Sequence, residues 1–176
     1  MNFIRISDGV FYSSGRIVKV GKAEINQLKQ FALETSRKRS RLCAHQHTDD
    51  LLHEMLIVLE KDIYIRPHKH LGKSESFHVI EGEVDIVIFD DQGGIFDVIE
   101  MGVYASEEVF YYRLSESLFH TVLVKSDIAV FHETTNGPFR LEDTIFAEWS
   151  PEDGNAEAMQ QFSENLKHRL TEFARR

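Results

Sequence analysis

The chain has 176 residues, of which 42% are apolar and 28% charged, so it is long enough for one domain with a hydrophobic core and short for two. Its net charge of −9 argues against a nucleic-acid partner, because phosphate binding depends on clustered Lys and Arg. Cys43 is the only cysteine, which excludes an internal disulfide, and there is neither a signal-peptide pattern nor an apolar run longer than Met55–Leu59. We therefore expect a cytoplasmic protein without a membrane partner.

Short alternating or apolar segments recur between turn signals, a rhythm typical of a β-sandwich or barrel. Asp and Gly in 90–94 tolerate the positive φ of hairpin turns, and 125–127 and 136–138 indicate further turns. The expected strands, in chain order, are Phe3–Ile6, Arg16–Val20, Arg39–His45, Glu54–Glu60, Ile63–His68, Glu75–Glu81, Val84–Phe89, Ile95–Met101, Val109–Leu114, Leu118–Val124, Ile128–Thr134 and Thr144–Trp149.

Two amphipathic helices are expected to cover the β structure. One spans Lys22–Ser36, and the other follows a start signal at Ser150–Asp153. The apolar face of the second helix consists of Ala158, Met159, Phe162, Leu166, Leu170 and Phe173. We expect a single domain over 1–176, with strands and a helix in 1–50, a barrel in 51–150 and the last helix in 151–176.

The segment from His68 to Gly82 contains residue types that bind metals. Residues two apart on a strand point to the same face, so His68 and His70 aim their imidazoles at one point. A short loop lets Glu75 enter the neighbouring strand at the same level, and His120 alternates inward within an apolar strand. Two imidazoles, a carboxylate and a further imidazole form a divalent-metal site that leaves positions open.

The other histidines are expected to have structural or solvent-exposed roles. A single histidine is more often solvated or hydrogen-bonded than a ligand, and His47, His53 and His168 are interpreted in this way. Alternation directs His78 away from Glu75, so we expect it outside the barrel, in a packing or interface role.

The pattern His-x-His-x4-Glu-x6-Gly from His68 to Gly82 resembles the first cupin motif, with Asp62 at the usual opening Gly. The second cupin motif normally has Pro and Gly before its histidine and Asn after it. Here only His120 matches, and Ser115, Ser117 and Val124 stand at the other places. From about Ile4 to Pro151 the chain resembles the WbuC family of cupin-fold metalloproteins, found among lipopolysaccharide O-antigen biosynthesis functions. The residues that carry this resemblance are Glu54–Ile57, Arg66–His70, Glu75–His78, Phe89–Asp91, His120, Thr121, Phe131–Glu133, Gly137–Phe139, Phe146, Ala147, Trp149 and Pro151.

This resemblance implies a mainly β, cupin-type double-stranded β-helix (a jelly-roll barrel) with a short N-terminal helix and a C-terminal amphipathic helix. It also implies one divalent metal ion held by His68, His70, Glu75 and His120. The ligand set accepts Fe, Mn, Ni, Co or Zn. Cys43 stands where the family usually has Asn in the strand before the barrel.

Further side chains are candidates for contact with a ligand beside the metal. Alternation places Tyr64 and Arg66 on the face of His68, and it places Arg41 on the face of His45. If both faces point inward, the two guanidinium groups suit a carboxylate or phosphate. Alternatively, Arg41 lies on an edge strand facing water.

For two pairs of neighbouring residues, the sequence does not decide which side chain points inward. His132 and Glu133 point to opposite faces of one strand, and an inward Glu133 would pair with Arg66 or Arg41. The same holds for Tyr111 and Tyr112, one of which would supply a hydroxyl.

These residues favour a metal-dependent enzyme acting on a small anionic or sugar-derived metabolite, with an isomerase, an epimerase or an Fe(II) dioxygenase as candidate activities. The alternatives are a binding or sensing cupin without turnover and a cupin in which the metal only braces the barrel. No residue is assigned a catalytic role. Exposed barrel edges are compatible with a homodimer.

Overall fold

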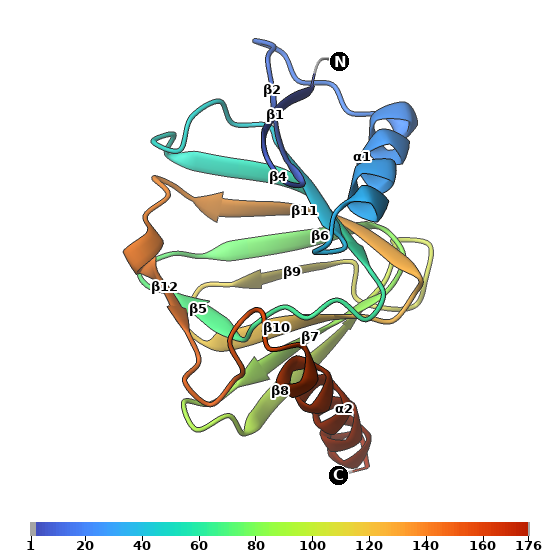
Figure 1. Ribbon diagram of the computed structural model, residues 1–176, viewed down its shortest axis with the longest axis vertical. Coiled ribbons are helices and arrows are strands. Elements are labelled where there is room, and N and C mark those ends of the chain that lie inside the picture. Colours follow the sequence, from blue (N-terminus) through green and yellow to red (C-terminus); the bar gives the residue numbers. More distant parts are fainter. Residues whose placement is uncertain (1–2, 176) are drawn as a thin grey trace.

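The computed structural model describes residues 3–175, whose strands form two facing sheets (Figure 1). The larger sheet has the order β1-β2-β3-β4-β11-β6-β9 and the smaller sheet the order β12-β5-β10-β7-β8. The strands are β1 (Phe3–Ser7), β2 (Val10–Ser13), β3 (Arg39–Cys43), β4 (Leu52–Glu60), β5 (His68–His70), β6 (Glu75–Glu81), β7 (Val84–Phe89), β8 (Ile95–Met101), β9 (Tyr111–Leu114), β10 (Phe119–Val124), β11 (Ile128–Asn136) and β12 (Thr144–Phe146).

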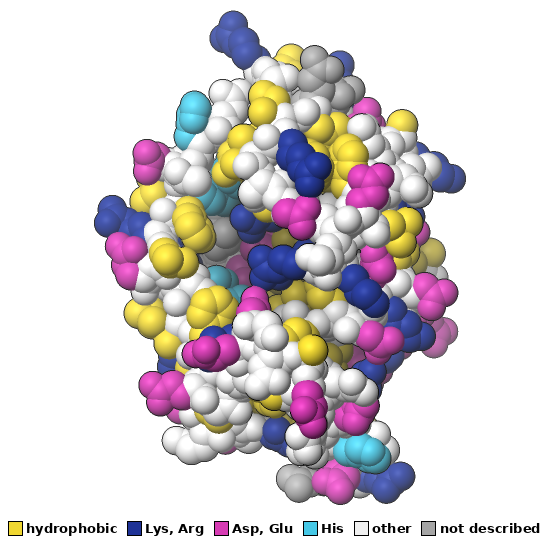
Figure 2. Space-filling view, in the orientation of Figure 1, with side chains coloured by type: hydrophobic (Ala, Val, Ile, Leu, Met, Phe, Trp, Pro, Cys, Tyr) yellow, Lys and Arg dark blue, Asp and Glu magenta, His cyan; other side chains and the backbone are white. Residues whose placement is uncertain are grey.

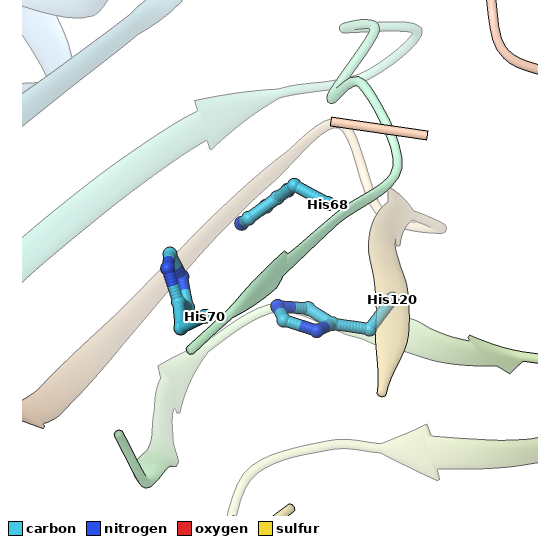
Figure 3. A group of neighbouring side chains, drawn as sticks. All are labelled: His68, His70 and His120. Carbon is cyan, nitrogen blue, oxygen red and sulfur yellow. The ribbon is translucent and has the colours of Figure 1, made fainter. Parts of the chain in front are cut away.

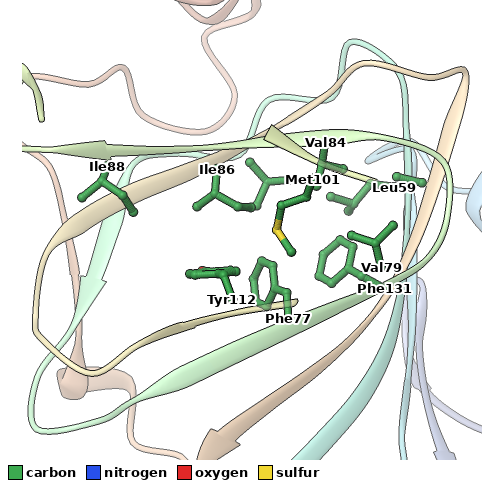
Figure 4. Packing of buried hydrophobic residues seen from close by; sticks show 11 residues of the cluster. Leu59, Phe77, Val79, Val84, Ile86, Ile88, Met101, Tyr112 and Phe131 are labelled. Carbon is green, nitrogen blue, oxygen red and sulfur yellow. The ribbon is translucent and has the colours of Figure 1, made fainter. Parts of the chain in front are cut away.

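The hydrophobic core lies between the two sheets, where every second side chain of each strand points inward (Figure 4). Phe77 of β6 stacks on Phe131 of β11 with ring centroids 4.6 Å apart. From the opposite sheet, Ile86 of β7 and Met101 of β8 complete this packing, and both are almost fully buried. The two sheets are therefore held together by apolar contacts on their inner faces.

Helix α1 (Lys22–Glu34) covers the outer face of the larger sheet. Its residues Leu28 and Ala32 are fully buried against Leu42 of β3 and Val58 of β4. The helix matches the predicted 22–36 segment to within two residues.

Helix α2 (Ala156–Phe173) covers the outer face of the smaller sheet. Leu166 is buried against Val87 and Phe119, and Phe162 and Leu170 pack around them. The helix begins after Asn155, whose side chain accepts a hydrogen bond from the backbone N–H of Ala158, and so it starts later than the Ser150–Asp153 signal suggested. No helix in residues 3–175 has the length and apolar character needed to span a membrane.

The mainly β architecture with two helices confirms the predicted fold class. Strands β6, β7 and β8 have the predicted bounds, whereas 16–20 is not a strand and β2 was not expected. The predicted strand Ile63–His68 is also wrong, since this segment is irregular up to Pro67 and β5 begins at His68. Proline lacks the N–H that a strand ladder requires, which favours this late start.

Candidate metal centre

Three histidines from two neighbouring strands meet on the inner face of the smaller sheet (Figure 3). His68 and His70 lie two residues apart on β5 and point to one side, as the alternation predicted. His120 of β10 is directly opposite His68 in the antiparallel pair. One ring nitrogen from each of the three lies within 4.8 Å of the others, so a single ion can contact all three.

Hydrogen bonds orient the three rings. His68 donates from Nδ1 to the backbone oxygen of Arg66 (2.8 Å), and His120 donates from Nδ1 to that of Leu118 (3.0 Å). The Nδ1 of His70 lies 3.2 Å from the hydroxyl of Thr144 on β12. When Nδ1 carries the proton, Nε2 is left with a free lone pair, which is the form in which imidazole binds metals.

Glu75, at the start of β6, brings a carboxylate from the larger sheet to two of the three histidines, His120 and His70. Its Oε1 lies 3.0 Å from Nε2 of His120, and its Oε2 lies 3.7 Å from Nε2 of His70. The hydroxyl of Tyr112 donates a hydrogen bond of 2.8 Å to Oε1, and Glu75 is only 5% exposed. The carboxylate is therefore buried and fixed in orientation on the side where the imidazole nitrogens converge.

Within the cluster, Glu75 and His120 stabilise each other's charged forms, whereas burial opposes charge on His68 and His70. Burial opposes the charged forms, but the charge and hydrogen bond of His120 outweigh it for Glu75 and lower the pKa of that carboxyl to about 2. The pKa of His120 is raised, because its interaction with the Glu75 carboxylate outweighs the effect of burial. Burial and then the charge of His120 lower the pKa of His68 to about 3, so His68 is neutral and able to ligate.

This donor set fits a divalent transition-metal ion. Imidazole nitrogens and carboxylates are the ligands of many Zn, Fe, Mn, Ni and Co sites, and three histidines would leave positions open for further ligands. A cavity of about 10 Å³ adjoins the cluster, with Lys73 and Glu116 among its lining residues. Sequence reasoning had not singled out these two residues, because nothing in their local pattern distinguishes them from solvated charges.

Glu133 and Arg41 both lie on the inner face of the larger sheet. Glu133 is two residues from the core residue Phe131, and Arg41 pairs with Ile57 across β3 and β4. His132 points outward, where its Nε2 lies 3.8 Å from Oε1 of Glu54, so the undecided pair is resolved with Glu133 inward. Figure 2 shows that this side of the molecule is hollowed near its centre, with histidine, basic and acidic side chains gathered there.

No ion pair joins Glu133 to Arg41 or Arg66 within residues 3–175, contrary to the expected pairing. Burial, and then the charge of Glu75, raises the pKa of the Glu133 carboxyl to about 8, while Arg41 acts in the opposite direction. Arg41 itself is exposed. The charges that act on Glu133 are those of Glu75, Arg41 and His120, so this carboxyl lies beside the histidine cluster.

Tyr64 and Arg66 do not share the face of His68, because the alternation is interrupted at Pro67. The hydroxyl of Tyr64 donates to the backbone oxygen of Pro151 (2.8 Å), and its ring contacts Phe162 of α2. Arg66 donates to the hydroxyl of Ser150 (3.3 Å) and to the backbone oxygen of Ala147, with its guanidinium over the ring of Phe146. Both side chains therefore form hydrogen bonds with the segment that precedes α2.

His45 and His53 form a stacked pair with ring centroids 3.9 Å apart. The Nδ1 of His45 accepts a hydrogen bond of 3.2 Å from the backbone N–H of Glu54. His53 is only 5% exposed, and its Nε2 has no hydrogen-bond partner among the described residues, so it is not solvated as expected. Its stacking on His45 is a structural role, and it is not part of the histidine cluster. His78 is exposed and contacts Phe110, as expected for a residue outside the barrel.

Of the undecided tyrosines, Tyr112 is the inward one, and it holds Glu75 through its hydroxyl. Thr144 was not identified from sequence, because its contact with His70 arises only when β12 pairs with β5. Both residues support the proposed ligands without belonging to the recognisable motif.

The two facing sheets, with a histidine cluster on the inner face at one end, define a cupin-type barrel with a site suited to a metal ion. A family described as "Domain of unknown function (DUF6016)" matches residues 20–101, which include His68, His70 and Glu75 but not His120. No curated protein matches the sequence.

Solved structures with the same fold share little sequence with this chain. Protein SO0799 from Shewanella oneidensis is 12% identical, with a TM-score of 0.50, over 72% of this chain and 78% of that one. Oxalate decarboxylase from Bacillus subtilis is 19% identical, with a TM-score of 0.45, over 56% of this chain and 24% of that one. Oxalate decarboxylase from Lactobacillus farciminis, in a formate complex, is 11% identical, with a TM-score of 0.44 and coverages of 55% and 27%. The chain thus spans about a quarter of the length of these decarboxylases. The likeness to protein SO0799 shows the fold alone.

Proposed function

We propose that the protein binds one divalent metal ion through His68, His70, His120 and Glu75 and uses it to act on a small anionic or sugar-derived metabolite. The observation that carries the proposal is the convergence of three imidazole nitrogens within 4.8 Å, with the carboxylate of Glu75 at 3.0 Å from one of them. A bound ion would supply Lewis-acid polarisation of an oxygen atom or activation of water.

The surrounding side chains favour an anionic ligand. Arg41 is exposed on the inner face of β3 and has no ion-pair partner among the described residues, so its guanidinium is free to grip a carboxylate or phosphate. Glu133, with its pKa raised to about 8, is positioned to hold a proton beside such a ligand without repelling it. Tyr112 keeps Glu75 oriented toward the cluster.

The link to lipopolysaccharide O-antigen biosynthesis is the narrower part of this proposal. It rests on the residues that resemble the WbuC family, above all the segment Arg66–His70 and the outlying His120. A sugar phosphate or nucleotide sugar would offer both the anionic group for Arg41 and the oxygen atoms for the ion.

The ligand part of the proposal can be tested by calorimetric titration of metal-loaded protein with phosphate, acetate and glucose 1-phosphate. We expect binding of at least one anion and loss of that binding after metal removal. The affinity should be about 10–100-fold lower in Arg41→Ala, since a charge-assisted hydrogen bond contributes roughly 1.5–3 kcal/mol. Arg5→Ala, on the edge strand β1, is the control, because this exposed arginine is already paired with Asp8. Absence of metal-dependent anion binding, or full affinity in Arg41→Ala, would contradict the assignment. NMR spectra of the added ligand would show whether it is converted or only bound.

A further inference from the structure

A second cavity, of about 720 Å³, lies outside the metal centre between the barrel and α2. Its walls are the loop 36–38 after α1 with the start of β3, the segment 62–64, the end of β10 and one side of α2. Small-molecule sites commonly have volumes of about 300–1,000 Å³, so this cavity is large enough for a metabolite. Val124, which lines it, is four residues from His120 on β10, or about 13 Å along the strand, with the barrel core between.

The acidic side chains that line this cavity have partners, whereas two of its basic side chains have none among the described residues. Its acidic residues are engaged: Asp153 pairs with Arg37 (3.0 Å), Asp62 pairs with Lys167 (2.9 Å), and Glu164 accepts a hydrogen bond from Gln160. Within the described chain, by contrast, no hydrogen bond or ion pair reaches the guanidinium of Arg39 or the ammonium of Lys38.

Arg39 is the more informative of these two cations, because it is partly buried. Burial, and then the neighbouring charge of Arg37, lowers the pKa of its guanidinium to about 10, so the group remains charged at neutral pH although its surroundings oppose the charge. Asp153 acts in the opposite direction, but its carboxylate is already paired with Arg37. A partly buried charge without a hydrogen-bonded counter-ion of its own is costly, which makes an anion in the cavity favourable.

The backbone at the cavity is also unusual. Lys38 (φ 51°) and Asp62 (φ 60°) are the two non-glycine residues with positive φ in residues 3–175, and both line it. Side chains other than Gly rarely adopt this conformation, and where they do, it tends to accompany functional sites. The remaining wall contains apolar groups, among them Ile63, Leu123 and Met159, that can contact a non-polar part of a ligand.

We propose that this cavity is a second ligand site, which binds a small amphipathic anion with its phosphate or carboxylate on Arg39 and Lys38 and its apolar part against Ile63 and Met159. The site is separate from the metal centre and does not require the ion. It therefore provides either a second substrate pocket or a place for an effector molecule.

Phenyl phosphate and benzoate are suitable probes, with benzyl alcohol as the uncharged control. In calorimetric titrations of EDTA-treated protein, in which the metal centre cannot bind anions, we expect one of the anions or both to bind at one site per chain, and we expect the same binding to persist in metal-loaded protein. Arg39→Gln should lower the affinity at least about tenfold, because a hydrogen-bonded charge is lost, whereas Arg5→Gln should leave it unchanged. The preferred probe distinguishes a phosphate ligand from a carboxylate ligand.

A second measurement uses the native protein and therefore does not depend on the folding of Arg39→Gln. The methyl group of Met159 lines the cavity, and that of Met101 lies in the barrel core, so ¹³C-methyl NMR should show a shift of the Met159 signal and none of the Met101 signal on addition of the anion. The proposal is overturned if neither anion binds saturably, if benzyl alcohol binds as tightly, if metal removal abolishes binding, or if Met159 is unaffected. Loss of metal-dependent anion binding in Arg41→Ala, by contrast, concerns the first site alone.

Discussion

At the scale of single residues, the hydroxyl of Tyr112 is the contact that fixes Glu75. Tyr112→Phe removes this 2.8 Å hydrogen bond with little change in volume. Residues that orient metal ligands typically contribute about 10–100-fold to metal affinity, so we expect a loss of that size for Mn²⁺ or Zn²⁺ in calorimetric titrations. Tyr111→Phe is the matched control, because Tyr111 is 50% exposed and points away from the site. Equal affinities of the two variants would show that Tyr112 does not position Glu75.

Gly82, in the turn between β6 and β7, is required for two reasons that can be separated. Gly72 and Gly82 both have positive φ, at 66° and 80°, so alanine at either position should cost about 1–2 kcal/mol. A Cβ on Gly82 would also overlap with the backbone oxygen of Ile128, whereas a Cβ on Gly72 would meet nothing within 4 Å. Urea unfolding of the metal-free variants should therefore show a larger stability loss for Gly82→Ala. If Gly72→Ala is equally destabilised, the close approach to Ile128 is unimportant.

At the scale of elements, α2 is held to the barrel mainly by Leu166, which is 2% exposed. Leu166→Ala should lower the free energy of unfolding by about 2–5 kcal/mol, the usual range for a buried leucine. The neighbouring Asn165 is exposed, and Asn165→Ala should have almost no effect or stabilise the helix slightly. Thermal unfolding followed by circular dichroism measures both. An unchanged midpoint for Leu166→Ala would mean that α2 contributes little to the stability of the barrel.

Strand alternation predicted β10 to within one residue and the common face of His68 and His70, although it placed the strand at Ile63–His68 instead of His68–His70. It failed for Tyr64 and Arg66, since Ile65 and His68 both face the barrel interior although they are three residues apart. The alternation is interrupted because of Pro67 and of the way in which residues 61–67 pack across the sheets. A pattern that repeats every two residues cannot predict such an interruption. The start of α2 was misplaced for a similar reason, because Asn155 caps the helix more effectively than the earlier Ser-Pro signal.

At the scale of the whole molecule, the sequence was sufficient to predict the mainly β fold and the three histidines that the structure brings together. It was not sufficient for the inward placement of Glu133, the hydrogen bond from Tyr112 or the cavity beside α2. These features depend on how distant segments approach one another, as when residues 36–39 and α2 enclose the same space. Local patterns contain no information on such contacts.

The central claim, that His68, His70, His120 and Glu75 hold one divalent metal ion, is tested most directly by elemental analysis of the purified protein and its variants. We predict about one equivalent of metal per chain in the native protein and in His78→Ala, whose exposed ring lies outside the barrel, and little or none in His70→Ala and Glu75→Ala. Full metal content in both His70→Ala and Glu75→Ala, at native levels of folding, would contradict the assignment.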